Sequence, residues 1–170
     1  DRVAVAFAAN FQQGMKRYSV IVLHQLPSPK NHVSGLVGKM KSLKIPLLYI
    51  VGNSSMVSGF NNYQDLIRIN GNTGLVNEAQ AEVGDDFNLF TISDEIVAAV
   101  RKFPPVQTPF GNITVSPNAQ VLMRQKIGTL STDYPLLAFS QAGSVKNAVF
   151  LGDGLWRWRL YDFLQNGNHD

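Results

Sequence analysis

One short apolar run constrains the fold of this chain more than any other stretch. The run Ile45–Val51 is entered through Pro46 and followed by Gly52-Asn53-Ser54-Ser55. An apolar run of this length between turn-forming residues is typical of a strand buried on both faces. Such strands occur in parallel sheets that helices cover. The run therefore predicts an α/β fold, and any ligand would bind just past Val51.

The preceding stretch completes a strand–helix–strand unit. Tyr18–Gln25 is rich in β-branched residues and predicts a second strand, which Pro27 ends. We expect Asn31 to cap the helix between the two strands. The apolar positions of this helix recur at helical spacing: Val33, Leu36, Val37, Met40 and Leu43.

Periodicity and turn residues predict the remaining elements. Val3–Ala8 is expected to be a strand, and Ser58–Asn77 a loop with one helical turn near Tyr63–Ile67. Gly84-Asp85-Asp86 suggests a hairpin between Glu78–Val83 and Phe87–Ile92. A helix capped by Ser93 should run to Lys102, before Pro104-Pro105. Further strands are expected at Asn112–Val115, Ala119–Ile127, Tyr134–Ser140 and Asn147–Leu151, and a final helix at Leu155–Leu164.

Composition narrows the class of protein. With 170 residues, 45% of them hydrophobic and 16% charged, the chain is expected to form a single domain over residues 1–170. The net charge of +3 is spread without a basic run, which argues against nucleic acid as a partner. No apolar stretch approaches the roughly 18 residues of a membrane span. Because the sequence starts at Asp1 without an initiator methionine, we expect a piece of a longer protein.

Five polar residues are candidates for a ligand-binding edge at the ends of the predicted parallel strands: His24, Gln25, Asn53, Ser54 and Asp153. Asp153 could be a catalytic carboxylate, but an Asp in this position more often caps the following helix. His24, His32 and His169 have no spacing that supports a metal site, and there is no cysteine. No metal and no cofactor are therefore expected.

The final helix carries the candidate interaction surface. Trp156, Leu160 and Phe163 stand at i, i+4 and i+7, which favours a core-facing stripe. Trp158 and Tyr161 lie on a neighbouring stripe that could face a partner. Arg157 and Arg159 could form ion pairs or cation–π contacts, or bind an anion.

Three segments together resemble the class I glutamine amidotransferases. Val20–Pro29 is similar to the strand that precedes their oxyanion loop, and Ile45–Gly52 to their nucleophile strand. Val149–Gly154 lies where the family has Val-Gln-Phe-His-Pro-Glu. The resemblance implies a three-layer, flavodoxin-like α/β fold with a mostly parallel sheet and added antiparallel hairpins. The first strand and helix of that fold would precede Asp1.

The same resemblance implies that the family's chemistry is missing. Its nucleophilic Cys, His and Glu fall on Val51, Gly152 and Gly154, and the glycine before the nucleophile falls on Tyr49. A glutaminase needs a thiolate, a base and oxyanion donors. We therefore expect no glutaminase activity.

A second resemblance concerns the parent protein. Gly152-Asp153-Gly154-Leu155 followed by Trp156-Arg157-Trp158-Arg159-Leu160 is similar to a signature of large bacterial membrane proteins, notably of the Bacteroidetes. These carry a von Willebrand factor A-type domain and end in an amidotransferase-like domain. The resemblance implies a domain of a membrane-anchored protein, with the periplasmic side slightly favoured.

Three functions follow as hypotheses. The first is a non-catalytic interaction or scaffold domain, whose partner is a protein or another domain of the same parent chain. The second is a small-molecule or carbohydrate-binding module at the former active-site edge. The third is an enzyme of another reaction class that uses Asp153 or His24, which would require two titratable groups within hydrogen-bonding reach.

Overall fold

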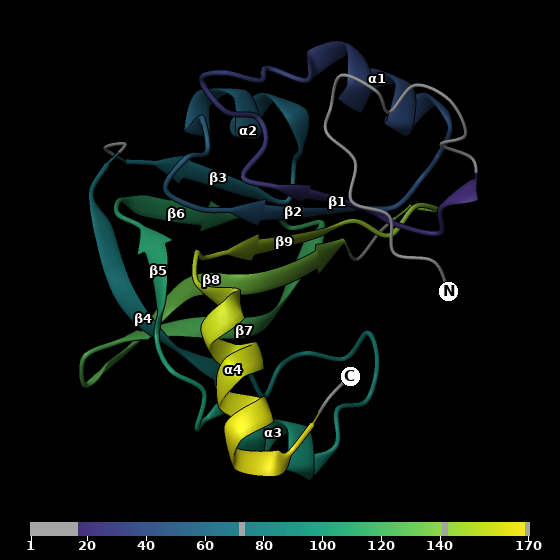
Figure 1. Cartoon of the computed structure of the whole chain (residues 1–170). Coiled ribbons are helices and arrows are strands. Elements are labelled where there is room, and N and C mark those ends of the chain that lie inside the picture. Colours follow the sequence, from purple (N-terminus) through teal and green to yellow (C-terminus); the bar gives the residue numbers. More distant parts are fainter. Residues whose placement is uncertain (1–16, 72–73, 141–142, 169–170) are drawn as a thin grey trace.

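The computed structural model describes residues 17–71, 74–140 and 143–168, which form a curled seven-stranded sheet and a small two-stranded sheet, with helices on both sides of the larger one (Figure 1). The expected strand Val3–Ala8 and His169 lie outside the described residues. The strands are β1 (Ile21–His24), β2 (Leu47–Val51), β3 (Ile67–Asn70), β4 (Val76–Val83), β5 (Val106–Pro109), β6 (Asn112–Val115), β7 (Ala119–Ile127), β8 (Leu130–Ser140) and β9 (Ala148–Leu151). The helices are α1 (Ser34–Ser42), α2 (Val57–Tyr63), α3 (Asp94–Val100) and α4 (Leu155–Asn166).

The main sheet contains seven strands in the order β1-β2-β9-β8-β7-β4-β5. The pairs β1–β2 and β2–β9 are parallel, whereas β9–β8, β8–β7, β7–β4 and β4–β5 are antiparallel. The expected flavodoxin-like, class I amidotransferase-like three-layer fold with a mostly parallel sheet is therefore wrong. The prediction relied on short, fully apolar runs, which are typical of parallel strands. The longest strands of the sheet are antiparallel, and those runs gave no information about them.

The parallel part is built as expected. β1, α1 and β2 form a strand–helix–strand unit in which Ile21 pairs with Leu47 and His24 with Ile50. Helices α1 and α2 cover one face of this part (Figure 1). The core beneath them includes Leu23, Tyr49 and Phe60. Alternate residues of β1 and β2 supply this core because strand side chains point to opposite faces in turn.

A second apolar core fills the opposite face of the antiparallel part. Val100 from α3 and Val106 from β5 pack there with Leu136 and Phe150. Gln125 is fully buried beside them, where it accepts a hydrogen bond from Thr108 Oγ1 (2.8 Å) and donates one to the Pro135 carbonyl (2.8 Å). These bonds satisfy an amide whose unpaired burial would be costly.

Several local expectations were wrong. The N-cap of α1 is Val33, with no side-chain cap, so Asn31 does not cap this helix. The stretch expected to be a loop at Ser58–Asn77 contains α2, β3 and the start of β4. Strand β3 pairs with β6 in a separate two-stranded sheet. Ser93 does cap α3, since its side chain accepts a hydrogen bond from the Ile96 amide (3.4 Å).

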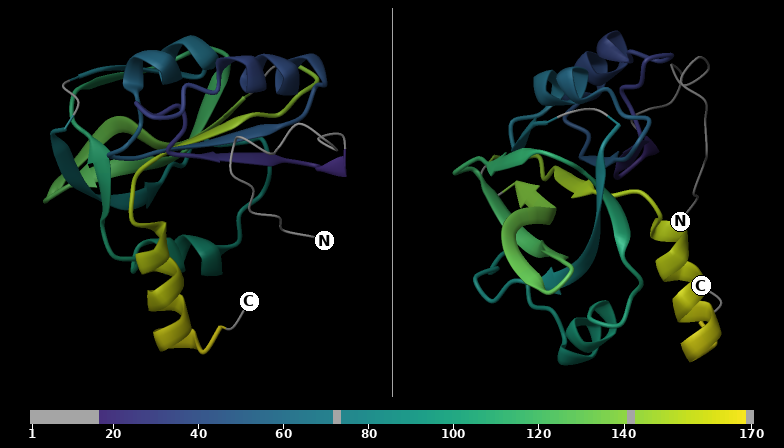
Figure 2. Two further views of the ribbon diagram at one scale, coloured as in Figure 1. Left: turned by 45° about the horizontal axis from the view of Figure 1, so that its top comes forward. Right: turned by 90° about the vertical axis from the view of Figure 1, so that its left-hand side faces the viewer.

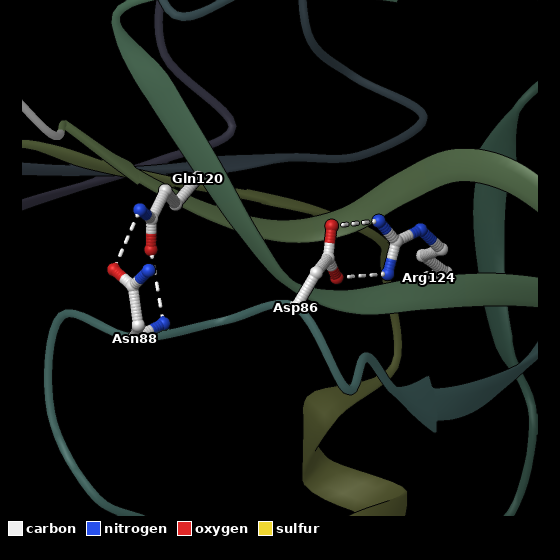
Figure 3. Close-up of polar contacts among 4 residues, drawn as sticks. All are labelled: Asp86, Asn88, Gln120 and Arg124. Carbon is white, nitrogen blue, oxygen red and sulfur yellow. Dashed lines mark hydrogen bonds and ion pairs between the residues drawn. The ribbon is translucent and has the colours of Figure 1, made fainter.

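The expected hairpin at Glu78–Ile92 is also absent, because β4 pairs with β5 and β7 instead. Residues 84–92 form a loop that polar side-chain contacts connect to β7 (Figure 3). Asp86 accepts two hydrogen bonds from the Arg124 guanidinium, at 2.9 and 2.8 Å. Asn88 and Gln120 exchange a second pair, at 3.1 and 2.8 Å. Side-chain contacts thus replace the backbone ladder that the hairpin would have made.

The Asp86–Arg124 pair makes stability depend on pH. The hydrogen bond from Arg124 holds the pKa of the Asp86 carboxyl below its ordinary value. The stability that the ion pair contributes is therefore fully present above the pKa of Asp86 in the unfolded chain, about 3.9. It is lost as the pH falls through the lower pKa of Asp86 in the folded protein. For an exposed pair, we expect D86N to lower the free energy of unfolding by about 0.2–1 kcal/mol at neutral pH. Urea unfolding should show this difference shrinking below about pH 4.

The matched control is D85N, which removes a neighbouring charge that makes no hydrogen bond to Arg124. It should change stability less than D86N at every pH. Equal effects of the two variants would mean that net charge, rather than the bidentate pair, sets the pH dependence.

Candidate functional site

The carboxyl ends of β1, β2 and β9 meet at one edge, since the three strands are parallel. This brings Gln25, Ser54 and Asp153 together. Gln25 Nε2 donates to Asp153 Oδ2 (3.0 Å), and Gln25 Oε1 accepts from the Ser54 amide (2.9 Å). Both ends of the Gln25 amide are therefore used within the protein, across a sequence separation of 128 residues to Asp153.

Gly52 lies directly beneath this contact. A Cβ atom on Gly52 would be 3.0 Å from Gln25 Cδ and 3.1 Å from Asp153 Cβ, tighter than ordinary packing. The Gly52 amide donates to Ser55 Oγ (3.0 Å). The strand end is thus covered by side chains that contact one another, and a residue larger than glycine would displace them.

Gln107 belongs to the same cluster and was missed from the sequence. Its Oε1 accepts from Asn53 Nδ2 (3.0 Å). Its backbone forms a two-bond bridge to Asp153, at 3.0 and 2.8 Å. The alternation Val106-Gln107-Thr108 was the available signal for a strand here. Long-range pairing, which no local pattern encodes, places Gln107 at this edge.

Four of the five predicted ligand-binding residues thus share one cluster: Gln25, Asn53, Ser54 and Asp153. His24 ends β1 with an exposed side chain and takes no part in the hydrogen bonds between described residues at this edge. The expected capping role of Asp153 was wrong. The N-cap of α4 is Gly154, whose φ of 100° favours glycine, and it makes no side-chain cap.

Space at this edge is small. The cavity beside Gly52 and Asn53 has a volume of about 20 Å³, which suits roughly one water molecule. Small-molecule sites typically measure about 300–1,000 Å³. Within residues 17–71, 74–140 and 143–168, no three His, Cys, Asp or Glu side chains are grouped to hold a metal ion.

Tyr49 stands where the amidotransferase resemblance places the glycine before the nucleophile, and it is core. Its side chain is 1% exposed, its ring meets Phe60 edge-on (5.9 Å), and its hydroxyl donates to the Tyr63 carbonyl (3.2 Å). Burial, together with the nearby Asp65 carboxylate, raises the pKa of Tyr49 well above its ordinary range. Burial thus favours the neutral phenol.

Helix α4 is oriented opposite to expectation. Trp158 stacks on Phe103 (5.0 Å between ring centroids), meets Phe150 edge-on (5.6 Å) and donates from Nε1 to the Pro104 carbonyl (2.7 Å). Tyr161 also contacts Phe103 edge-on (6.0 Å). The stripe expected to face a partner therefore faces the protein. The rings of Trp158 and Tyr161 pack on other aromatic rings there, and the indole N–H also has a hydrogen-bond acceptor. Helical spacing alone does not show which of two apolar stripes will make such contacts.

The stripe expected to face the core is exposed instead. Trp156, Leu160 and Phe163 are 64%, 47% and 41% exposed. We define the α4 stripe as Trp156, Leu160 and Leu164, the last of which is 66% exposed. Arg157 lies over the Trp156 ring (5.6 Å) and reaches the Pro105 carbonyl (3.4 Å), while Arg159 donates to the Asn168 carbonyl (2.7 Å). Figure 2 shows α4 extending away from the sheet. No helix among the described residues is long and apolar enough to cross a membrane.

Comparisons with known proteins add little to this description. Neither a family model nor a curated protein matches the sequence. Solved structures give remote likenesses. A β-galactosidase from Bacillus circulans sp. alkalophilus is 12% identical, with a TM-score of 0.49 over 92% of this chain and 24% of its own. The β-galactosidase Gan42B of G. stearothermophilus, in its E323A form, is 8% identical, with a TM-score of 0.47 over 89% and 22%.

A third likeness is to the cytoplasmic protein STM1381 from Salmonella typhimurium LT2. It is 14% identical, with a TM-score of 0.46 over 88% of this chain and 66% of its own. This chain spans less than a quarter of the two galactosidases. Likenesses this remote assign no activity, because one architecture serves many functions.

The two tryptophans of α4 provide a stability test. W158A removes a partly buried, stacked indole and its hydrogen bond, so we expect the free energy of unfolding to fall by about 1–3 kcal/mol. W156A removes an exposed ring and should change it by no more than about 0.5 kcal/mol. Urea denaturation of both variants measures the difference.

Far-ultraviolet circular dichroism of W158A before denaturation would show whether the variant still folds. If W156A destabilised the protein as much as W158A, the orientation of α4 described above would be wrong.

Proposed function

We propose that this chain is a non-catalytic interaction domain whose contact surface is the α4 stripe. The observation that carries the proposal is the exposure of Trp156, Leu160 and Leu164 on a helix of which no residue is buried. Apolar side chains at i, i+4 and i+8 form the face that amphipathic helices insert into a groove of a partner. Trp is also enriched among the residues that dominate binding energy.

The closed strand edge supports the non-catalytic part of the proposal. The amidotransferase resemblance places the nucleophile at Val51 and the histidine at Gly152, and neither residue can supply that chemistry. Asp153 is the one titratable side chain in the cluster of Gln25, Asn53, Ser54, Gln107 and Asp153. An acid–base pair needs a second titratable group within reach, so an enzyme of another class is not supported either.

The partner that we propose is a protein or another domain of the same parent chain. The resemblance of Gly152–Leu160 to bacterial membrane proteins with a von Willebrand factor A-type domain supports such a parent, anchored in a membrane. A helix that extends from the sheet could reach a neighbouring domain without rearrangement of the core (Figure 2).

Site-specific photocrosslinking tests the interaction surface. A photoreactive benzoylphenylalanine at Leu164 should capture a partner protein in the cells that make the parent protein. The same group at Leu130, the first residue of β8, should not. The two leucines form a matched pair, because each is 66% exposed. Excess purified wild-type chain should compete with capture at Leu164, whereas L160Q should compete more weakly.

Equal capture at Leu164 and Leu130, or none at either position, would contradict the role of α4. Equal competition by the wild-type chain and L160Q would also contradict this role, because the two chains differ only at Leu160 of the α4 stripe.

A second candidate function is the small-molecule or carbohydrate-binding module. It is favoured by the convergence of Gln25, Asn53, Ser54 and Asp153, although these groups bind one another. A ligand would have to break the Gln25–Asp153 hydrogen bond to enter.

Thermal unfolding with a panel of amino acids and mono- and disaccharides separates the two functions. A ligand at 100 times its Kd stabilises the folded state by about 2.7 kcal/mol, which raises the melting temperature by several degrees. We expect no shift for any compound at millimolar concentration. A shift that Q25A abolishes would establish a ligand site at the strand edge and favour the second function.

A further inference from the structure

A cavity lies inside the loop that joins β4 to α3, and we call it the loop hollow. Apolar side chains from β4, the loop and α3 line it, among them Val83, Phe87, Phe90 and Val97. Its volume is about 430 Å³, against about 20 Å³ for the cavity at the strand edge. Because sites for small molecules typically measure about 300–1,000 Å³, the loop hollow has room for a ligand and the strand edge does not.

The first part of this loop is fixed to β7 (Figure 3). Arg124 donates to Asp86 at 2.9 and 2.8 Å, and Asn88 and Gln120 exchange hydrogen bonds at 3.1 and 2.8 Å. Gly84 makes this arrangement possible, since a Cβ atom there would collide with the Arg124 guanidinium. A site that is ordered before its ligand arrives loses less entropy on binding.

Two aromatic rings and one carboxylate line the loop hollow. Phe87 and Phe90 meet edge-on, with 4.8 Å between their centroids, and Phe90 is 50% exposed. The Asp85 carboxylate is also exposed there, and no described residue forms an ion pair with it. The face of an aromatic ring attracts a cation, and an ionised carboxylate forms strong hydrogen bonds with N–H groups that carry positive charge.

The charges around the loop hollow favour the same kind of ligand. Residues 69–100 contain six Asp or Glu residues and no Lys, Arg or His, although the net charge of the whole chain is +3. The guanidinium of Arg124 interacts with three carboxylates, those of Asp85, Asp86 and Asp133, and its hydrogen bonds go to Asp86. The excess of negative charge attracts cations and repels anions.

We propose that the loop hollow binds an organic cation, namely an ammonium or guanidinium group carried on an apolar body. The charged group binds Asp85, and the apolar body packs against Phe87 and Phe90. A metal ion fits less well, because no three His, Cys, Asp or Glu side chains are grouped to hold one among the described residues.

The loop hollow shares no lining residue with the α4 stripe, so either proposal can fail alone. The amino acids of the thermal unfolding panel carry a carboxylate as well as an ammonium group. The negative charge around the loop hollow repels this carboxylate. We therefore expect amines without a carboxylate to bind where amino acids do not.

Nuclear magnetic resonance titration of the isotope-labelled chain with phenethylamine tests the proposal, because this amine is phenylalanine without its carboxylate. The amide signals of residues 84–92 should shift and saturate. Phenylalanine itself, and phenylethanol, in which a hydroxyl replaces the ammonium group, should bind at least about threefold more weakly. The capped dipeptide N-acetyl-lysyl-phenylalanine amide shows where the cation comes from. Tighter binding than phenethylamine would indicate a side chain of a protein segment, and weaker binding a free amine.

Two single-charge variants form the matched control. D85N removes the carboxylate that receives the ammonium group and should raise the Kd for phenethylamine at least about threefold. D94N removes an exposed acidic residue in the first turn of α3 and should change the Kd less. The dispersion of the same spectra shows whether each variant is folded. The proposal would be overturned by a lack of saturable shifts in residues 84–92, by equal binding of phenethylamine and phenylethanol, or by equal effects of D85N and D94N.

Discussion

Strand β9 holds the two halves of this molecule together. All four of its residues are buried, and it pairs in parallel with β2 and antiparallel with β8. Its Val149 and Leu151 enter the core beneath α1 and α2, while Phe150 enters the core on the other face. The strand therefore joins the sheet through its backbone and both cores through its side chains. A fold with two pairing modes needs such a strand at the junction.

The position of β9 also determines the character of the strand edge. Because β9 runs parallel to β2, it delivers Asp153 to the ends of β1 and β2, where the side chain meets Gln25. In an open α/β sheet this edge is where ligands bind. Here polar side chains from four segments saturate one another, so the convergence of functional groups produces a closed surface. Convergence of polar groups and availability for binding are separate properties.

Sequence reasoning succeeded where the signal was local. The strand–helix–strand unit, the strands at residues 112–115 and 119–127, the Ser93 cap and the existence of the last helix followed from spacing and turn residues. It failed where pairing across the chain decided the outcome. Residues 87–92 alternate in a way that resembles a strand, yet Phe87 and Phe90 pack on Phe139 as a loop. The strand that was expected to pair with them, β4, pairs with β5 and β7 instead.

The candidate site shows the same difference between local signals, which the sequence reveals, and long-range pairing, which it does not. Parallel strand ends correctly predicted that Gln25, Asn53, Ser54 and Asp153 would come together. They could not predict that Gln107 would join them, because β5 is brought there by pairing with β4. On α4 the helical period was right and its phase was wrong. Either of two apolar stripes could have faced the protein. The contacts of Trp158 with Phe103 and Phe150, both outside the helix, decide which one does.

The placement of the two tryptophans gives the chain an internal optical contrast. Both lie on α4 only two residues apart, and the chain has no other tryptophan. One indole stacks on Phe103 and meets Phe150 edge-on, while the other is open to solvent. Their emission therefore comes from two environments on the same helix. Detachment of α4 would redden the signal of the first, and coverage of the stripe would shift the second to the blue.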